Sequence, residues 1–236
     1  LQLRLHQQDQ SAVDVGIAVA RIAADQDLQA LLSRDPGYSY AYVNRGLILL
    51  MQAYAEEETA VKTGLWEAAE EAFTQALATL PPAEAAYAFD IYSNLAVVHY
   101  RLGSMAQAKA DFERAVGPNL DCAPVFTSEL AQLMPDRAGD MCAQAAYSYG
   151  GIYTPIEAGS SGTVAQLANL VIEHASLPLL KSLGLARLAE VHQFNGEPAA
   201  ACSSAQQAAA GSPDSEQFRE LVRELCAPPV TPAAVQ

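Results

Sequence analysis

The segment around His99 is repeated around His192, and a repeated histidine is a first candidate for acid–base or metal chemistry. NLAVVHYRLGSMAQAKADFERAV (94–116) returns 93 residues later as RLAEVHQFNGEPAAACSSAQQAA (187–209), with Leu, Ala, Val, His and Gly in the same places. A histidine that binds zinc or acts as a base needs partners at defined spacing, and no HExxH, GxSxG, Walker or GxGxxG pattern occurs. We therefore predict no catalytic residue, no metal site and no cofactor, and a protein that is not an enzyme.

Other reactive side chains have plain structural interpretations. Glu56, Glu57 and Glu58 form a run that suits a solvated helix. The segment GSSGT (159–163) resembles a nucleophile turn only superficially, and we interpret Thr163 as a helix N-cap. An enzyme built on a helical scaffold is therefore only weakly supported.

The four cysteines Cys122, Cys142, Cys202 and Cys226 lack the CxxC spacing of zinc and redox motifs. Two interpretations are open at this point. They are either four buried thiols of a cytoplasmic protein or two disulfides of an extracytoplasmic one.

The elements that position these residues are predicted to be helices. The 236 residues are 51% hydrophobic, enough to bury a sizeable core, and Pro and Gly gather between segments. No convincing alternation of Val, Ile and Thr indicates a strand. The fold class predicted is all-α.

The charge and hydropathy of the chain bear on its partners. A net charge of −14 would repel a phosphate backbone, so nucleic acid is a poor candidate. No apolar stretch reaches the length of a transmembrane segment, and the N-terminus does not resemble a signal peptide. Because the sequence does not start with Met, a removed signal or an upstream membrane anchor remains open.

The chain also resembles the tetratricopeptide repeat family, whose helix–turn–helix units of about 34 residues stack into a solenoid. The clearest unit, about 89–120, matches the large, small and aromatic positions of the family with Tyr92, Leu95, Ala96, His99, Gly103, Ala108, Phe112 and Ala115. A unit at about 39–81 matches with Tyr42, Gly46, Gly64, Ala69, Phe73, Ala76 and Pro81, and one at about 182–213 with Leu188, Ala189, Gly196, Ala201, Ala208 and Pro213.

The resemblance implies a domain organisation. A single TPR-like α-solenoid would span 1–226, with an irregular middle between 121 and 178, a capping helix near 215–225 and a Pro-rich tail or linker at 227–236. The unit at about 39–81 holds about eleven extra residues, which would lengthen its helical hairpin by about three turns. Gly46, inside a helix, would allow a close helix crossing.

The family also implies roles for single residues. His99 and His192 fall where the first helix faces its hairpin partner, which makes them packing residues, and Trp66 is expected in the core. The concave face of the solenoid would present Tyr40, Val43, Asn44, Asp90, Asn94, Tyr100, Arg101, Arg187, Glu190 and Phe194 as a groove for a protein or peptide partner. No Lys occupies the predicted groove, which argues against the subtype that clamps a C-terminal carboxylate.

The cysteine pairing follows from helix geometry, with one conflict. Cys202 and Cys226 flank the turn GSPDS (211–215) on two antiparallel helices and stand within roughly 5 Å in height, which suits a disulfide. This pairing leaves Cys122 for Cys142, although the repeat register would hold them about 15 Å apart. We predict both disulfides, and residues 121–142 folded as something other than a regular repeat.

The function predicted is a non-catalytic interaction or scaffold module that binds a peptide or helix in its concave groove. The alternative is an extracytoplasmic sensor or small-ligand-binding domain, in which the tyrosine-rich loop 147–157 closes over a ligand. The disulfides favour an extracytoplasmic location, whether periplasmic, secreted or as a membrane-anchored ectodomain, and a cytoplasmic location is the alternative. The oligomeric state is left open.

Overall fold

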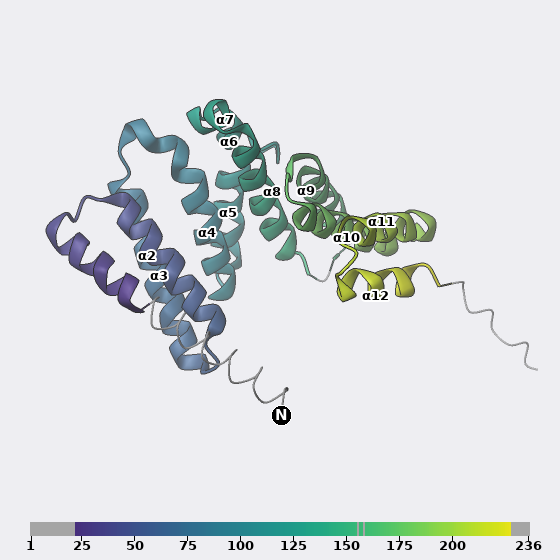
Figure 1. The fold of residues 1–236 in the computed structure, drawn as a ribbon, viewed down its shortest axis with the longest axis horizontal. Helices are drawn as coiled ribbons and strands as arrows, with labels where there is room; N and C mark the ends of the chain where they lie inside the picture. Colours follow the sequence, from purple (N-terminus) through teal and green to yellow (C-terminus); the bar gives the residue numbers. More distant parts are fainter. Residues whose placement is uncertain (1–21, 155, 158, 228–236) are drawn as a thin grey trace, which may run out of the picture. The chain divides into compact units, whose positions relative to one another are not determined.

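The computed structural model describes residues 22–154, 156–157 and 159–227, and Figure 1 shows them as helices joined by short loops. No strand occurs within these ranges, so the all-α prediction is confirmed for them. None of the helices in the described part of the chain is long and apolar enough to cross a membrane. The predicted tail at 227–236 lies outside the described residues except for Ala227.

The chain divides into two compact units, the described residues up to Asp111 and those from Phe112 onward. The division falls inside helix α5 (Met105–Val116). Unit 1 contains a helix at 22–34, α2 (Ser39–Ala55), α3 (Thr59–Thr79), the 3-10 helix η1 (Pro82–Tyr87), α4 (Ala88–Arg101) and the first part of α5. Within it, α2 packs along α3, and α4 packs against α3 and touches α2.

The hairpin of α2 and α3 is built around Gly46. A Cβ added at this glycine would lie 2.7 Å from the Phe73 ring, so the absence of a side chain lets the two helices approach. The expected close crossing is confirmed. The carboxylate of Glu56 ends α2 by accepting hydrogen bonds from the backbone N–H groups of Glu57 and Glu58, at 2.8 Å each. The extra residues of this segment thus extend a hairpin of 17- and 21-residue helices.

The core of unit 1 lies on both sides of α3. Trp66 is 5% exposed, as expected for a core residue, and Phe73 is fully buried. Both pack with buried residues of α2 and α4, among them Leu49, Ile91 and Leu95. Alanines on α3 let the neighbouring helices come close.

Unit 2 is a succession of helices, each packed on the next. After the end of α5 come α6 (Ala123–Phe126), α7 (Glu129–Leu133), α8 (Pro135–Gly151), α9 (Ser161–His174), α10 (Pro178–Phe194), α11 (Pro198–Gly211) and α12 (Glu216–Leu225). From α8 onward every helix packs against its successor. Phe218 of α12 is buried against α10 and α11, which makes α12 the cover of the last helix pair.

Both predicted disulfides are present. Cys122 and Cys142 have Cα atoms 5.8 Å apart and join the start of α6 to α8, while Cys202 and Cys226, 4.9 Å apart, join α11 to the end of α12. No free cysteine remains. Residues 121–142 fold as two short helices and the start of α8, as expected for a segment outside the repeat pattern.

The predicted N-cap at Thr163 is wrong, because α9 already begins at Ser161 and Ser160 occupies the N-cap position. The Ser160 hydroxyl accepts a hydrogen bond from the Glu157 N–H and donates one to the Glu157 carbonyl, at 3.1 Å each. This turn starts the helix earlier than the sequence pattern indicates.

Candidate functional site

One stripe of α2 carries large side chains that the core does not cover. Tyr40 is 38% exposed, Met51 41% and Tyr54 51%, and Asn44 is exposed between them. These residues recur at intervals of three, four or seven positions, so they share one side of the helix. Two of them, Tyr40 and Asn44, are predicted groove residues. The third predicted residue of this helix, Val43, is half-buried and packs against the core.

Helix α4 adds a cation to this stripe. The Arg101 guanidinium lies 5.2 Å from the centre of the Tyr54 ring and 5.9 Å from that of Tyr100. Both distances suit a cation–π contact. Tyr54 in turn meets Trp66 edge to face, with ring centres 5.0 Å apart. We call the exposed Tyr40, Asn44, Met51, Tyr54 and Arg101 the α2–α4 face.

Two further predicted groove residues lie on α4. The Asn94 side chain donates a hydrogen bond to the backbone carbonyl of Asp90, at 2.9 Å. Both residues are half-buried. Asn94 is therefore tied to its own helix, which limits what it can offer a partner.

Three tyrosine rings gather where α2 begins, an arrangement that the sequence did not indicate. The ring centres of Tyr38 and Tyr40 are 6.1 Å apart, and those of Tyr40 and Tyr87 are 6.4 Å apart. The pKa of Tyr40 is raised, first by burial and then by the hydrogen bond and charge of the Glu84 carboxylate. We call Tyr38, Tyr40 and Tyr87 the tyrosine cluster.

His99 of α4 lies between two carboxylates. Its Nδ1 is 2.7 Å from Asp111 Oδ2 and its Nε2 is 3.1 Å from Glu70 Oε1. His99 is only 8% exposed and Asp111 only 4%. The histidine thus links α3, α4 and α5 in the interior. The second repeated histidine, His192, is half-buried at the end of α10 and contacts Glu197.

In unit 2, the predicted residues Arg187 and Glu190 line a small pocket of about 130 Å³. Tyr147 and Thr154 contribute from the end of α8 and the loop after it, Leu183 from α10 and Gln217 from α12. Burial and the nearby Glu190 raise the pKa of Tyr147, while Arg187 lowers it. Phe194, also predicted for the groove, is 45% exposed at the end of α10 and does not line this pocket.

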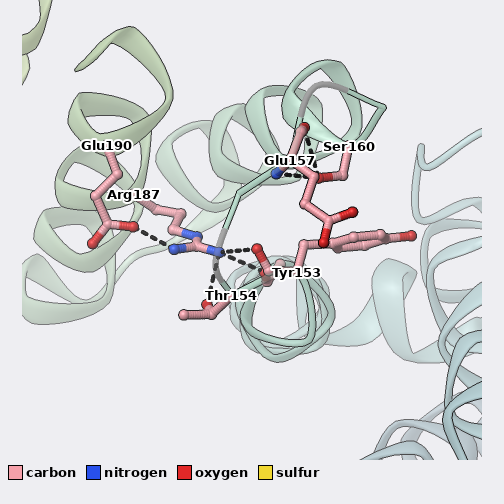
Figure 2. Close-up of polar contacts among 7 residues, drawn as sticks. Tyr153, Thr154, Glu157, Ser160, Arg187 and Glu190 are labelled. Atoms are coloured by element: carbon pink, nitrogen blue, oxygen red, sulfur yellow. Dashed lines mark hydrogen bonds and ion pairs between the residues drawn. The ribbon is translucent and has the colours of Figure 1, made fainter. Parts of the chain in front are cut away.

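Most donors of Arg187 are used within the protein. Figure 2 shows its guanidinium between Glu190 and the loop that follows α8. Its Nη2 donates to the carbonyls of Gly150 and Tyr153 and to the Thr154 hydroxyl, at 3.0, 3.2 and 3.0 Å, and its Nη1 pairs with Glu190. A cation at the C-terminal carbonyls of a helix is favourable. Arg187 therefore acts first as a clamp on the end of α8.

A second, open pocket of about 500 Å³ lies in unit 1 on the side of the 22–34 helix. It is lined in part by Leu32, Tyr42 and Gln75 and by Arg45, which pairs with Asp25 at 3.1 Å. Within the described residues, no group of three His, Cys, Asp or Glu side chains is placed to hold a metal ion.

Comparison with known proteins adds no family. The sequence matches no protein-family model, and no curated protein is significantly similar to it.

Proposed function

We propose that this protein is a non-catalytic binding module that uses the α2–α4 face to hold a segment of a partner protein. The observation that carries the proposal is the exposure of Tyr40, Met51 and Tyr54 along one side of α2, with Arg101 over the Tyr54 ring. Aromatic, Met and Arg side chains are enriched at protein interfaces, and exposed apolar patches often mark them. The proposal concerns unit 1 alone.

The order of the helices supports a solenoid of TPR-like units. The predicted unit at 39–81 spans the hairpin of α2 and α3, and the one at 182–213 spans α10 and α11. Gly46 stands at a close helix contact, as the family pattern implies. We propose on this basis that the chain is a tetratricopeptide-like protein with an irregular middle.

The disulfides support a location outside the cytoplasm. Two disulfides in a chain with no free cysteine are typical of proteins that fold in an oxidising compartment. We propose a periplasmic, secreted or membrane-anchored ectodomain setting.

A peptide-display selection tests the binding proposal. Peptides selected on the purified, oxidised protein are titrated against Met51→Ala and Arg101→Ala, each expected to weaken binding by about 1–3 kcal/mol. Val61→Ala is a matched control, because Val61 is 44% exposed on α3 and lies outside the α2–α4 face. If the two face variants bind every selected peptide as tightly as the wild-type protein does, the proposal is wrong.

A second function is favoured by the pocket of unit 2. Its lining combines an aromatic ring, a hydroxyl and a charge pair, which suits a small polar ligand. Thermal-shift screening with metabolites and sugars tests it, and a hit must be lost in Gln217→Leu. Stabilisation that persists in this variant would place the ligand elsewhere.

A further inference from the structure

The Glu84 carboxylate, which hydrogen-bonds with Tyr40 of the tyrosine cluster, has one oxygen that lacks a donor. Glu84, on η1, places its Oε2 in a buried position where no described residue donates a hydrogen bond to it. A buried carboxylate oxygen without a donor is costly, because that oxygen has lost water and gained no hydrogen bond in its place. The structure thus holds an acceptor whose partner is missing from the described part of the chain.

The rings around Glu84 favour one kind of donor. Aromatic faces carry negative charge and attract a cation within about 6 Å of the ring centre. Tyr40 contacts both other rings, at an interplanar angle of 68° with Tyr87 and of 57° with Tyr38, so neither pair stacks face to face. A neutral apolar group would leave the carboxylate oxygen without a hydrogen bond. A cation with N–H donors would make cation–π contacts with the rings and donate a hydrogen bond to the oxygen.

We propose that Tyr38, Tyr40, Tyr87 and Glu84 form a recognition site for a basic side chain, Lys or Arg, of the partner segment. The inference rests on the proposed function, because Tyr40 belongs to both the tyrosine cluster and the α2–α4 face. Two of the three rings are reached by solvent, since Tyr38 is 44% and Tyr40 38% exposed. The net charge of −14 also favours a basic partner through electrostatic attraction.

The test uses single-residue probes and tyrosine-detected NMR. The full, oxidised chain with ¹³C-labelled tyrosine rings is titrated with Nα-acetyl-arginine methylamide and with its neutral analogue, Nα-acetyl-citrulline methylamide. The arginine probe is expected to shift the ring signals of Tyr38, Tyr40 and Tyr87, and the citrulline probe to leave them in place. Equal shifts with both probes, or none with either, would overturn the proposal.

Glu84→Gln then removes the charge and keeps the shape. It is expected to weaken binding of the arginine probe by about fivefold or more, since the carboxylate supplies the charged contact. Glu57→Gln, in the loop between α2 and α3, changes the net charge equally and is expected to bind as wild type does. If Glu84→Gln loses helical content, Tyr38→Leu replaces it, with the same expected loss. Unchanged affinity in a folded variant counts against the site.

The outcomes also separate this inference from the binding proposal. If the arginine probe shifts the cluster but selected peptides ignore Met51 and Arg101, the cation site holds and the proposed function fails. If the peptides depend on Met51 and Arg101 while the arginine probe shifts no tyrosine, the function holds and the cation site fails.

Discussion

His99 lies in the interior between the carboxylates of Glu70 and Asp111. The bond to Asp111 is the shorter and the more buried of the two. His99 is therefore expected to stabilise the fold mainly through its contact with Asp111.

His99→Asn is expected to lower the free energy of unfolding by about 1–3 kcal/mol, because the shorter side chain cannot span both carboxylates and Asp111 loses a buried partner. Urea unfolding of the oxidised protein measures this. The matched control is His192→Asn, whose partner Glu197 is exposed, and it is expected to cost less than about 1 kcal/mol. Equal losses in the two variants would show that burial of the bridge is unimportant.

Tyr149 is expected to make the stability of the protein fall in alkaline solution. Its pKa is raised from the ordinary 10.0, first by burial, then by the neighbouring Tyr153 and the Glu113 carboxylate. Since the fold favours the neutral phenol, its contribution to stability is complete below that ordinary value. Above it the contribution is lost, by up to about 1.4 kcal/mol per pH unit.

Tyr149→Phe is therefore expected to lose less stability than the wild type between about pH 9 and pH 11. Unfolding in urea at each pH measures the difference, and the absence of free thiols limits disulfide exchange. Tyr54→Phe, at an exposed tyrosine, should follow the wild-type curve. Parallel curves for wild type and Tyr149→Phe would refute the prediction.

Two glycines inside helices allow the effect of packing on stability to be distinguished from the effect of helix propensity. Gly46→Ala is expected to destabilise the protein by about 1–3 kcal/mol, because the new Cβ would meet the fully buried Phe73 ring. Gly64→Ala, in α3 where a Cβ meets nothing, is expected to stabilise by up to about 1 kcal/mol. Chemical unfolding measures both. The two variants are expected to change the free energy of unfolding in opposite directions. A change in the same direction would contradict the close crossing at Gly46.

The sequence predicted what depends on local geometry. Cys202 and Cys226 flank a short turn at matching heights, and Gly46 inside an apolar helix indicated a close crossing. The sequence did not indicate contacts between residues far apart in the chain, such as that of Glu70 with His99 and that of Arg187 with the carbonyls of Gly150 and Tyr153. Their partners are set by how helices rotate against each other. The N-cap at Ser160 was missed because a turn to Glu157 outweighs the preference for Thr as N-cap.

At the scale of the whole chain, the disulfides are expected to set stability. Replacing Cys122 and Cys142 together by Ser should lower the free energy of unfolding by about 3 kcal/mol in the chain-entropy description. Replacing Cys202 and Cys226 together should lower it by a similar amount, so each double variant is a control for the other. Urea unfolding measures the loss. Thiol titration and intact mass of protein from its native compartment check the bonds, and four free thiols there would contradict both disulfides and the extracytoplasmic setting.

The same disulfides would govern how the chain responds to mechanical tension. The linked cysteines are 20 and 24 residues apart in sequence, and the segments between them are shielded from a force applied at the ends of the chain. At about 3.4 Å per extended residue, this shielded length amounts to roughly 150 Å that only reduction can release. A tether built from this chain would be short while oxidised and would lengthen abruptly on exposure to a reductant.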